Sequence, residues 1–330
     1  MGNFRCFYVN RDEAGSVNSR ITERDESELP NEQTLIRVEW SSLNYKDGLA
    51  ATGHPGVARN LPHVPGIDAA GKIVESDSSD LQSGDEVLVT GYELGAAHWG
   101  GWSELIRVPK DWVIAKPEGI SLRETMMIGT AGFTAAQGVH ELIRNEVTPD
   151  KGPIVVTGST GGVGCLAIKL LSKLGYQVFA VSGKSENEGW LKDLGAEGVL
   201  ARNEVMDDGK KPMLSTRWAG GIDTVGGPIL ANILKSTEVN GCVAACGMLA
   251  GVGIPISVFP FILRGVRLAG ITSSLCPRSI RETIWGKLSS EWKIDDLESV
   301  SREVAFSDLQ SEVDTILKGK IKGRVVVRVS

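Results

Sequence analysis

The sequence predicts an α/β protein in which a β-rich first domain precedes a doubly wound parallel sheet. Three observations predict this class. Short apolar or alternating segments between glycine and proline turns dominate residues 34–108, as expected of a compact β-barrel or sandwich. After residue 154, strand-like and helical segments alternate, which is typical of a parallel sheet. A glycine-rich turn at residues 158–164 joins the first of these strands to a helix.

The first domain is expected to consist mainly of strands, at residues 34–40, 69–74, 86–90 and 104–108. The pattern changes to helix after Ser121, with one helix over 122–128 and another over 131–143. We therefore predict that the β-rich domain covers residues 1–122.

The second domain is expected to alternate strands with helices. An apolar-faced helix follows the glycine turn, Gly175 caps it, and a strand covers residues 176–181. Later strands are expected near 198–201, 221–225, 242–246 and 266–271, with helices near 229–236 and 277–288. A helix over 309–317 and a strand over 323–329 close the chain. We predict that the second domain covers residues 123–295 and that residues 296–330 return to the first domain.

Composition excludes several classes of function. The 330 residues carry a net charge of -6 and no block of lysine and arginine, so we expect no nucleic-acid partner. Glycines and prolines interrupt the uncharged stretch 241–263, so we expect no membrane span. Five cysteines without a CxxC pair, and a first segment without an apolar signal core, predict reduced thiols in the cytoplasm.

The turn between the first strand and helix of the second domain suits a dinucleotide. Its first glycine permits a tight turn, the middle ones let backbone amides approach phosphate oxygens, and the last lets the helix pack close to the strand. The positive end of the helix dipole then faces the pyrophosphate. Three glycines alone can mark an ordinary loop, but the order strand, turn, helix, strand favours a nucleotide site. The expected cofactor-binding residues here are Gly158, Ser159, Thr160, Gly161, Gly162, Val163 and Gly164.

The end of the second strand indicates which dinucleotide binds. An NAD site needs an acidic residue there for the ribose 2′-hydroxyl. Here the chain reads Ser182-Gly183-Lys184, and Arg202 follows the third strand. A hydroxyl and two cations suit a 2′-phosphate, so we predict NADPH as the cofactor. The alternative is that both cations are solvated surface charges among nearby glutamates.

Motifs along the whole chain resemble the medium-chain dehydrogenase/reductase superfamily. The match is best to its zinc-independent quinone oxidoreductase branch, and within that branch to the acryloyl-CoA reductase subfamily. The resemblance implies a GroES-like β-rich catalytic domain and a Rossmann NADPH-binding domain. The motifs that carry it are Asn44-Tyr45-Lys46-Asp47, Pro65-Gly-Ile-Asp68-Ala-Ala-Gly71, Gly84-Asp85-Glu-Val, His98-Trp-Gly-Gly101, Gly129-Thr-Ala-Gly-Phe-Thr134, the glycine turn, Ile222-Asp-Thr-Val-Gly226, Ala245-Cys-Gly247, Pro260-Phe-Ile-Leu-Arg264 and Gly323-Arg324.

Zinc-containing members of that superfamily carry a Gly-His-Glu motif and a four-cysteine lobe. This chain reads Gly66-Ile67-Asp68 at the first position and has no cysteine between Cys6 and Cys165. Zinc needs about four ligands, and the histidines show no ligand pairing. We therefore predict no metal.

Two polar residues are the predicted catalytic groups. The resemblance places Tyr45 beside the nicotinamide, so Tyr45 is predicted to bind the cofactor, and its phenol can also donate to a developing enolate. The alternative is a packing aromatic. Asn44 is predicted to orient the substrate or the nicotinamide ribose, with a local capping role as the alternative. Asp68 lies in an apolar run and is expected to be buried and paired, and Asp47 to hold its loop.

By the same resemblance, further side chains contact the nicotinamide end of the cofactor. Each also has an ordinary structural role as its alternative: a helix cap, a turn, a core position or a surface ion pair. These residues are Thr130, Gly247, Met248, Ile262, Ser273 and Arg324.

The resemblance implies NADPH-dependent reduction of an activated C=C bond, with acryloyl-CoA as the leading substrate and propionyl-CoA as the product. Two alternatives stay open: an NADPH:quinone oxidoreductase, and an NADPH-binding protein without turnover. A CoA substrate requires cations for its phosphates, for which Arg59, Arg107, Arg278 and Arg281 are candidates. An apolar last strand of the sheet, within 242–271, predicts a homodimer that pairs edge strands.

Overall fold

The computed structural model describes residues 2–207 and 211–330. The chain divides into two compact units. Unit 1 comprises the described residues up to 130 together with 274–282 and 300–330, and unit 2 comprises 131–273 and 283–299. The domain ranges 1–122, 123–295 and 296–330 stay predictions, because compactness alone does not show which segments fold independently.

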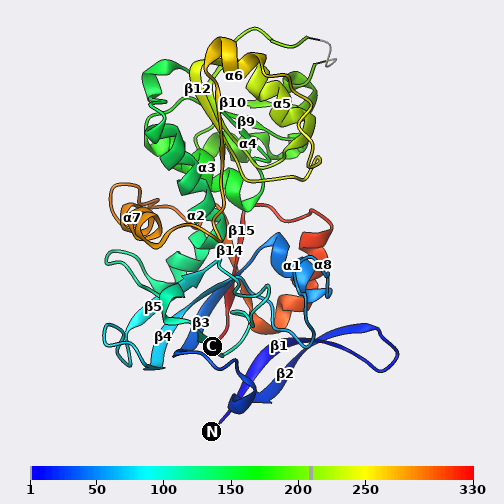
Figure 1. Ribbon diagram of the computed structural model, residues 1–330, viewed down its shortest axis with the longest axis vertical. Coiled ribbons are helices and arrows are strands. Elements are labelled where there is room, and N and C mark those ends of the chain that lie inside the picture. The colour runs from blue at the N-terminus through cyan, green and yellow to red at the C-terminus, as the bar shows by residue number, and fades with distance from the viewer. Residues whose placement is uncertain (1, 208–210) are drawn as a thin grey trace. The chain divides into compact units, whose positions relative to one another are not determined.

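Unit 1 is built on one large sheet (Figure 1). Strands β3 to β6 lie close to the segments expected from the sequence. The strands run in the order β14 (Ser301–Ala305), β15 (Arg324–Arg328), β3 (Thr34–Leu43), β4 (Asp68–Ser76), β5 (Glu86–Thr90) and β7 (Ile114–Ala115), and β6 (Leu105–Val108) also pairs with β3. The last strand of the chain, β15, is antiparallel to β3 and contributes the buried Val325, Val326 and Val327.

A hairpin that the sequence analysis did not predict precedes this sheet. Strands β1 (Asn3–Arg11) and β2 (Val17–Asp25) pair antiparallel along their whole length. Only β1 has a run of buried side chains, whereas β2 is intermediate or exposed throughout. The charged and polar residues of β2 therefore gave no apolar pattern to detect.

Two helices of unit 1 lie side by side, one early and one late in the chain (Figure 1). They are α1 (Tyr45–Ala51) and α8 (Leu309–Leu317). A Cβ at Gly48 in α1 would lie 3.0 Å from Ile316 and 3.2 Å from Leu317, so the glycine permits close packing of the two helices.

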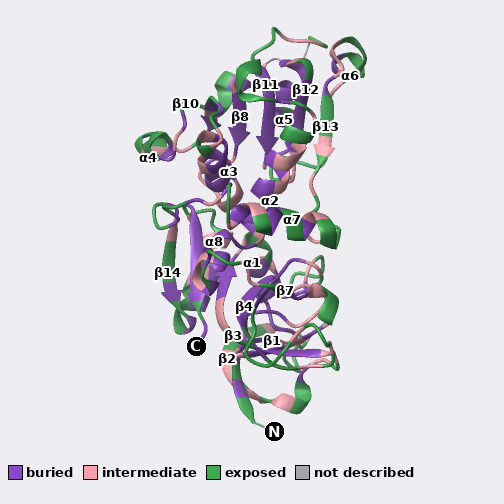
Figure 2. Cartoon of the chain, turned by 90° about the vertical axis from the view of Figure 1, so that its left-hand side faces the viewer, coloured by how far each residue is buried: buried purple, intermediate pink, exposed green. Residues whose placement is uncertain are grey.

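Unit 2 is a six-stranded sheet in which all the strands are parallel. The order is β10 (Gly198–Leu200), β9 (Val178–Val181), β8 (Ile154–Thr157), β11 (Trp218–Asp223), β12 (Thr237–Ala245) and β13 (Arg267–Gly270). Strand order therefore reverses between β8 and β11, as in the Rossmann fold. Figure 2 shows β8, β11 and β12 buried, whereas the edge strand β13 is mostly exposed.

Three helices lie close to the predicted positions: α3 (Gly162–Lys173), α5 (Gly227–Lys235) and α7 (Arg278–Leu288), which follows the last strand. Two short helices, α4 (Glu188–Asp193) and α6 (Phe259–Arg264), also lie between the strands. The sequence analysis predicted neither α4 nor α6, each of which is only six residues long.

The helical stretch α2 (Leu122–Arg144) breaks at Gly129, whose backbone is not helical (φ 51°, ψ -162°). The break falls between the helices expected over 122–128 and 131–143. A left-handed φ of this kind favours glycine. Among the described residues, no helix combines the length and apolar character needed to cross a membrane.

Candidate active site

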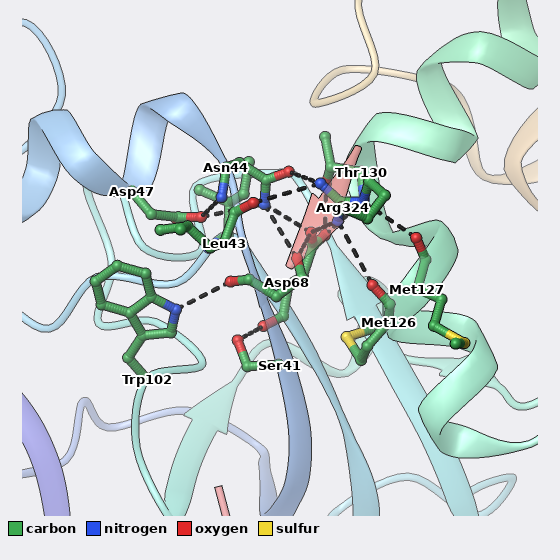
Figure 3. A network of polar contacts seen from close by, with 12 residues as sticks. Ser41, Leu43, Asn44, Asp47, Asp68, Trp102, Met126, Met127, Thr130 and Arg324 are labelled. Carbon is green, nitrogen blue, oxygen red and sulfur yellow. Dashed lines mark hydrogen bonds and ion pairs between the residues drawn. The ribbon is translucent and has the colours of Figure 1, made fainter. Parts of the chain in front are cut away.

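A buried polar network in unit 1 centres on the carboxylate of Asp68, the first residue of β4 (Figure 3). One oxygen, Oδ1, accepts hydrogen bonds from the Thr130 backbone N–H (2.8 Å) and from the Thr130 hydroxyl (2.6 Å). The other, Oδ2, accepts from the Asn44 amide (2.8 Å) and from the Ser42 hydroxyl. Four donors therefore converge on one carboxylate, which offsets the cost of burying its charge.

The positive charge nearest Asp68 belongs to Arg324 in β15. The Arg324 guanidinium is 2% exposed and lies 3.9 Å from Asp68 Oδ2. It donates to the side-chain oxygen of Asn44 (2.9 Å) and to the carbonyl of Met127 (3.1 Å). Asp68 is thus buried and paired, as expected, while Arg324 forms a buried ion pair instead of the surface pair considered as its alternative role.

The side chain of Asn44 is engaged at both ends of its amide. Its oxygen accepts from Arg324, and its nitrogen donates to Asp68 and to Asp47 Oδ2 (3.1 Å). Asn44 directly precedes α1, whose first residue is Tyr45. The Asn44 side chain is thus engaged within the network, and a direct contact of Asn44 with substrate or ribose stays a prediction.

Tyr45 itself is 49% exposed, so it is not a core aromatic. The backbone of the residue before it, Asn44, is held by the buried Asp47. Asp47 Oδ2 accepts from the Asn44 N–H (2.7 Å), and Asp47 Oδ1 accepts from the Ile67 N–H (2.8 Å). Asp47 therefore holds the loop before α1, as expected.

Gly129 lets this network close. A Cβ at this position would lie 2.6 Å from an Arg324 nitrogen and 2.7 Å from Asp68 Oδ2. The helix break thus brings the backbone of Gly129 close to the ion pair, and the Thr130 N–H donates to Asp68. Thr130 uses both of its donors inside the network, so its predicted contact with the cofactor stays a prediction.

Unit 2 holds the glycine turn at the carboxyl end of β8. Gly158 has a left-handed φ of 58°, and a Cβ on Gly164 would lie 2.5 Å from the Gly158 carbonyl. Gly161 caps α3, whose first turn contains Gly162, Val163 and Gly164. The N–H groups of a first helical turn lack intrahelical partners, so the turn and the helix together form a cradle for an anion.

Ser159 in this turn is buried and used within the fold. Its hydroxyl donates to the Val156 carbonyl (2.8 Å) and accepts from the Val181 N–H (3.0 Å), so it ties the turn to β9. Thr160 is half-buried. The cofactor contacts predicted for both residues stay predictions.

The residues predicted to select the 2′-phosphate come together at the ends of β9 and β10. The Ser182 N–H donates to the Leu200 carbonyl (3.0 Å), and the Lys184 N–H donates to the Ser182 hydroxyl (3.0 Å). The Arg202 side chain lies over Gly183, since a Cβ there would be 2.8 Å from Arg202 Nε. Ser182, Lys184 and Arg202 thus lie close together at the chain ends of β9 and β10, with the Arg202 guanidinium next to Gly183.

The other predicted cofactor contacts in unit 2 differ in burial. Gly247 makes a close backbone approach, because a Cβ there would lie 1.9 Å from the Thr224 carbonyl oxygen. Met248 and Ile262 are 69% and 72% exposed, and Ser273 is half-buried. Ile262 is therefore not a core residue, which was its alternative role.

Residues 30–118 match the alcohol dehydrogenase GroES-like domain, and residues 162–290 match the zinc-binding dehydrogenase family. Acrylyl-CoA reductase AcuI of Ruegeria pomeroyi is 42% identical and covers 99% of both chains. The chain belongs to the medium-chain dehydrogenase/reductase family. The predicted family and its two-domain α/β class are confirmed, and members of this family are oxidoreductases.

Two solved structures extend the comparison to the whole fold. Escherichia coli YhdH with bound NADPH is 42% identical, with a TM-score of 0.94 over 98% of this chain and all of that one. Bacillus subtilis yhfP with bound NAD is also 42% identical, with a TM-score of 0.96 over 99% of this chain and all of that one. A curated Bacillus subtilis relative, putative quinone oxidoreductase YhfP, is 43% identical over 96% of both chains.

Zinc is implied by the name of one matching family, but the residues of this medium-chain dehydrogenase/reductase do not fit it. Within residues 2–207 and 211–330, no three His, Cys, Asp or Glu side chains gather as metal ligands. All five cysteines are free thiols. Burial raises the pKa of Cys246 to about 12, which disfavours the thiolate that zinc binds. We derive no step through a metal.

Three of the four arginines considered for CoA phosphates are engaged within the protein. Arg281 is fully buried and donates to the Thr90 carbonyl (2.7 Å), which does not suit contact with a CoA phosphate. Arg107 pairs with Glu75, and Arg278 pairs with Glu282 (2.7 Å). Arg59 is exposed.

The sequence analysis assigned no role to several polar residues of both units. Ser42 bonds to Asp68 in unit 1, and Thr157, Asp223 and Thr224 form a buried cluster in unit 2. The signal for the cluster was present, because a polar residue ends an apolar strand at Thr157 and again at Asp223.

Asp47 supplies a test of this site through pH. Burial, and then repulsion from Asp68, raise its pKa from 3.8 to about 7. The folded protein therefore binds an extra proton between these values, and its free energy of unfolding falls as pH rises through that window, by about 1.4 kcal/mol per pH unit. Relative to Asp47→Asn, the wild type should lose stability up to about pH 7 and then level off. Urea unfolding between about pH 5 and 8 measures this difference.

The matched control is Asp314→Asn, at an exposed aspartate of α8. Its stability relative to the wild type should stay constant over the same pH range. A constant difference between the wild type and Asp47→Asn would contradict the raised pKa.

Proposed function

We propose that the protein reduces the activated C=C bond of acryloyl-CoA to give propionyl-CoA, with NADPH as hydride donor. The observation that carries the proposal is the glycine turn at the reversal point of the parallel sheet, with Ser182, Lys184 and Arg202 at the neighbouring strand ends. The similarity to acrylyl-CoA reductase AcuI, which covers 99% of both chains, supports the substrate class.

NADPH, when bound, supplies a hydride to the β-carbon of the enoyl thioester, and a proton is added at the α-carbon. In unit 2, the Gly158 turn and the first turn of α3 would hold the pyrophosphate through backbone N–H groups. In unit 1, Tyr45 would donate a hydrogen bond to the thioester oxygen as negative charge develops there. Asn44, Asp47, Asp68 and Arg324 would hold Tyr45 in place through their mutual contacts.

A quinone is the second candidate acceptor, because the Bacillus subtilis relative YhfP is named a putative quinone oxidoreductase. A flat, uncharged quinone needs no cations for CoA phosphates, and three of the four candidate arginines are engaged within the protein. NADPH donates the hydride in both reactions, so only a comparison of the two acceptors distinguishes the two proposals.

The edge strand β13 supports the proposed homodimer. This strand is mostly exposed, and exposed apolar side chains occur at and beside α6, which directly precedes it, at Val258, Phe259 and Leu263. A second copy of the chain would cover such residues. Light scattering of the purified protein tests this assembly. The cytoplasmic location stays a prediction.

The substrate proposal predicts fast, saturable NADPH oxidation with acryloyl-CoA and weak oxidation with benzoquinone. Loss of NADPH absorbance at matched acceptor concentrations measures both rates. The reverse ranking would assign the chain to quinone reduction. Tight NADPH binding without turnover of either acceptor would indicate a binding protein instead.

Tyr45→Phe tests the proposed donor. Loss of the hydroxyl should lower kcat with acryloyl-CoA about tenfold or more while the Kd for NADPH changes little, because the bond forms mainly in the transition state. Steady-state kinetics and a fluorescence titration separate the two constants. An unchanged kcat would reject this role.

The 2′-phosphate assignment predicts a difference between the two cofactors. Replacing both Lys184 and Arg202 by Ala should weaken NADPH binding at least about tenfold, because two charge-assisted contacts are lost, and should leave NADH binding nearly unchanged. Fluorescence titrations give both dissociation constants.

Lys192→Ala is the control for a general loss of charge, since Lys192 lies nearby on α4 and pairs with Glu188 (2.7 Å). It should leave both constants unchanged. An equal loss of affinity for NADPH and for NADH in the double variant would contradict the assignment of Lys184 and Arg202 to the 2′-phosphate.

A further inference from the structure

A second buried polar cluster lies in unit 2, at the carboxyl ends of β8 and β11. We define this strand-end cluster as Thr157, Asp223 and Thr224. The Thr157 hydroxyl donates to Asp223 Oδ1 (2.7 Å) and accepts from the Thr224 N–H (3.0 Å). The Thr224 hydroxyl donates back to the Thr157 carbonyl (2.9 Å). Thr157 and Asp223 are fully buried, so water cannot replace these partners.

The other oxygen of Asp223 holds the turn that leads into α5. Oδ2 accepts from the Gly226 N–H (2.6 Å) and the Val225 N–H (3.2 Å). Gly226 has a left-handed φ of 74°, so this turn is an unusual backbone path that needs such support. The carbonyl of Asp223 also accepts from the Cys246 N–H (2.9 Å), which ties the end of β12 to the same point.

Thr224 lies against two loops that face a dinucleotide in this fold. A Cβ at Gly158 would lie 2.1 Å from the Thr224 hydroxyl, and a Cβ at Gly247 would lie 1.9 Å from the Thr224 carbonyl oxygen. Both loops therefore rest directly on Thr224. Thr157 in turn holds Thr224 through two hydrogen bonds, and Asp223 holds the Thr157 hydroxyl.

We propose that the strand-end cluster is a positioning element for the dinucleotide. It holds the Gly158 turn and the Gly247 loop, already in the cofactor-free protein, at the spacing that the cofactor needs. Binding then costs less conformational entropy, because these loops are already ordered. None of its three side chains is assigned a contact with the cofactor. The inference rests on the proposed binding of NADPH.

Thr157→Val tests the cluster, because valine keeps the shape of threonine and removes the hydroxyl. We expect the Kd for NADPH to rise about tenfold, which corresponds to the loss of one or two buried hydrogen bonds. Thr157→Ser keeps the hydroxyl and should stay within about threefold of the wild type. In cofactor-free protein, hydrogen exchange of the segments at 158–164 and 225–227 should be faster in Thr157→Val.

The matched control is Thr34→Val in unit 1. Thr34 is also a fully buried strand residue, and its hydroxyl bonds to Ser76 (2.9 Å). This variant should lose thermal stability without a change in the Kd for NADPH. If Thr157→Val does not fold, Thr224→Val carries the test, since Thr224 is half-buried.

The outcomes separate the two proposals. A wild type that does not bind NADPH would overturn the proposed function and this inference together. A wild type that binds, with an unchanged Kd in Thr157→Val, would overturn this inference alone. Equal weakening in Thr34→Val would also overturn it, because the effect would then follow general destabilisation.

Discussion

The buried pair of Asp68 and Arg324 is the interaction on which unit 1 depends. Asp68 receives donors from the end of β3, the loop before α1 and the break in α2, while Arg324 brings in β15 from the end of the chain. Removing one partner from such a pair typically costs about 3–5 kcal/mol, because the other charge is left buried. Its function is to fix where these four segments meet, and Tyr45 stands at that meeting point.

Unit 2 applies the same principle with a single carboxylate. Asp223 accepts three donors at the ends of β8 and β11, and burial still raises its pKa. The hydrogen bonds favour the ionised carboxylate of Asp223, whereas its burial away from water favours the protonated form. In both units, therefore, a buried carboxylate lies beside a glycine with a left-handed backbone and accepts hydrogen bonds from the turn that contains it, Gly129 in unit 1 and Gly226 in unit 2.

Much of the fold was predictable because its signals are local. The strands β3 to β6 of unit 1 show in their apolar patterns, and the break in α2 shows as two apolar helical patterns separated at Gly129. The strands β2 and β14 were missed for one reason. Almost all of their side chains are intermediate or exposed, so pairing with a neighbouring strand, and not an apolar pattern, selects the extended backbone. Strand β1 was missed although its apolar side chains form a buried run.

By itself, the sequence determined the fold class, the family and the residues of the glycine turn, since these follow from short motifs and from the spacing of apolar residues. Only the tertiary structure decided what the polar residues do. Asn44 and Arg324 are 280 positions apart, and Thr157 and Asp223 are 66 apart. The physical reason is that a buried polar side chain takes its role from the partners that surround it, and those partners are brought together only when distant strands pair.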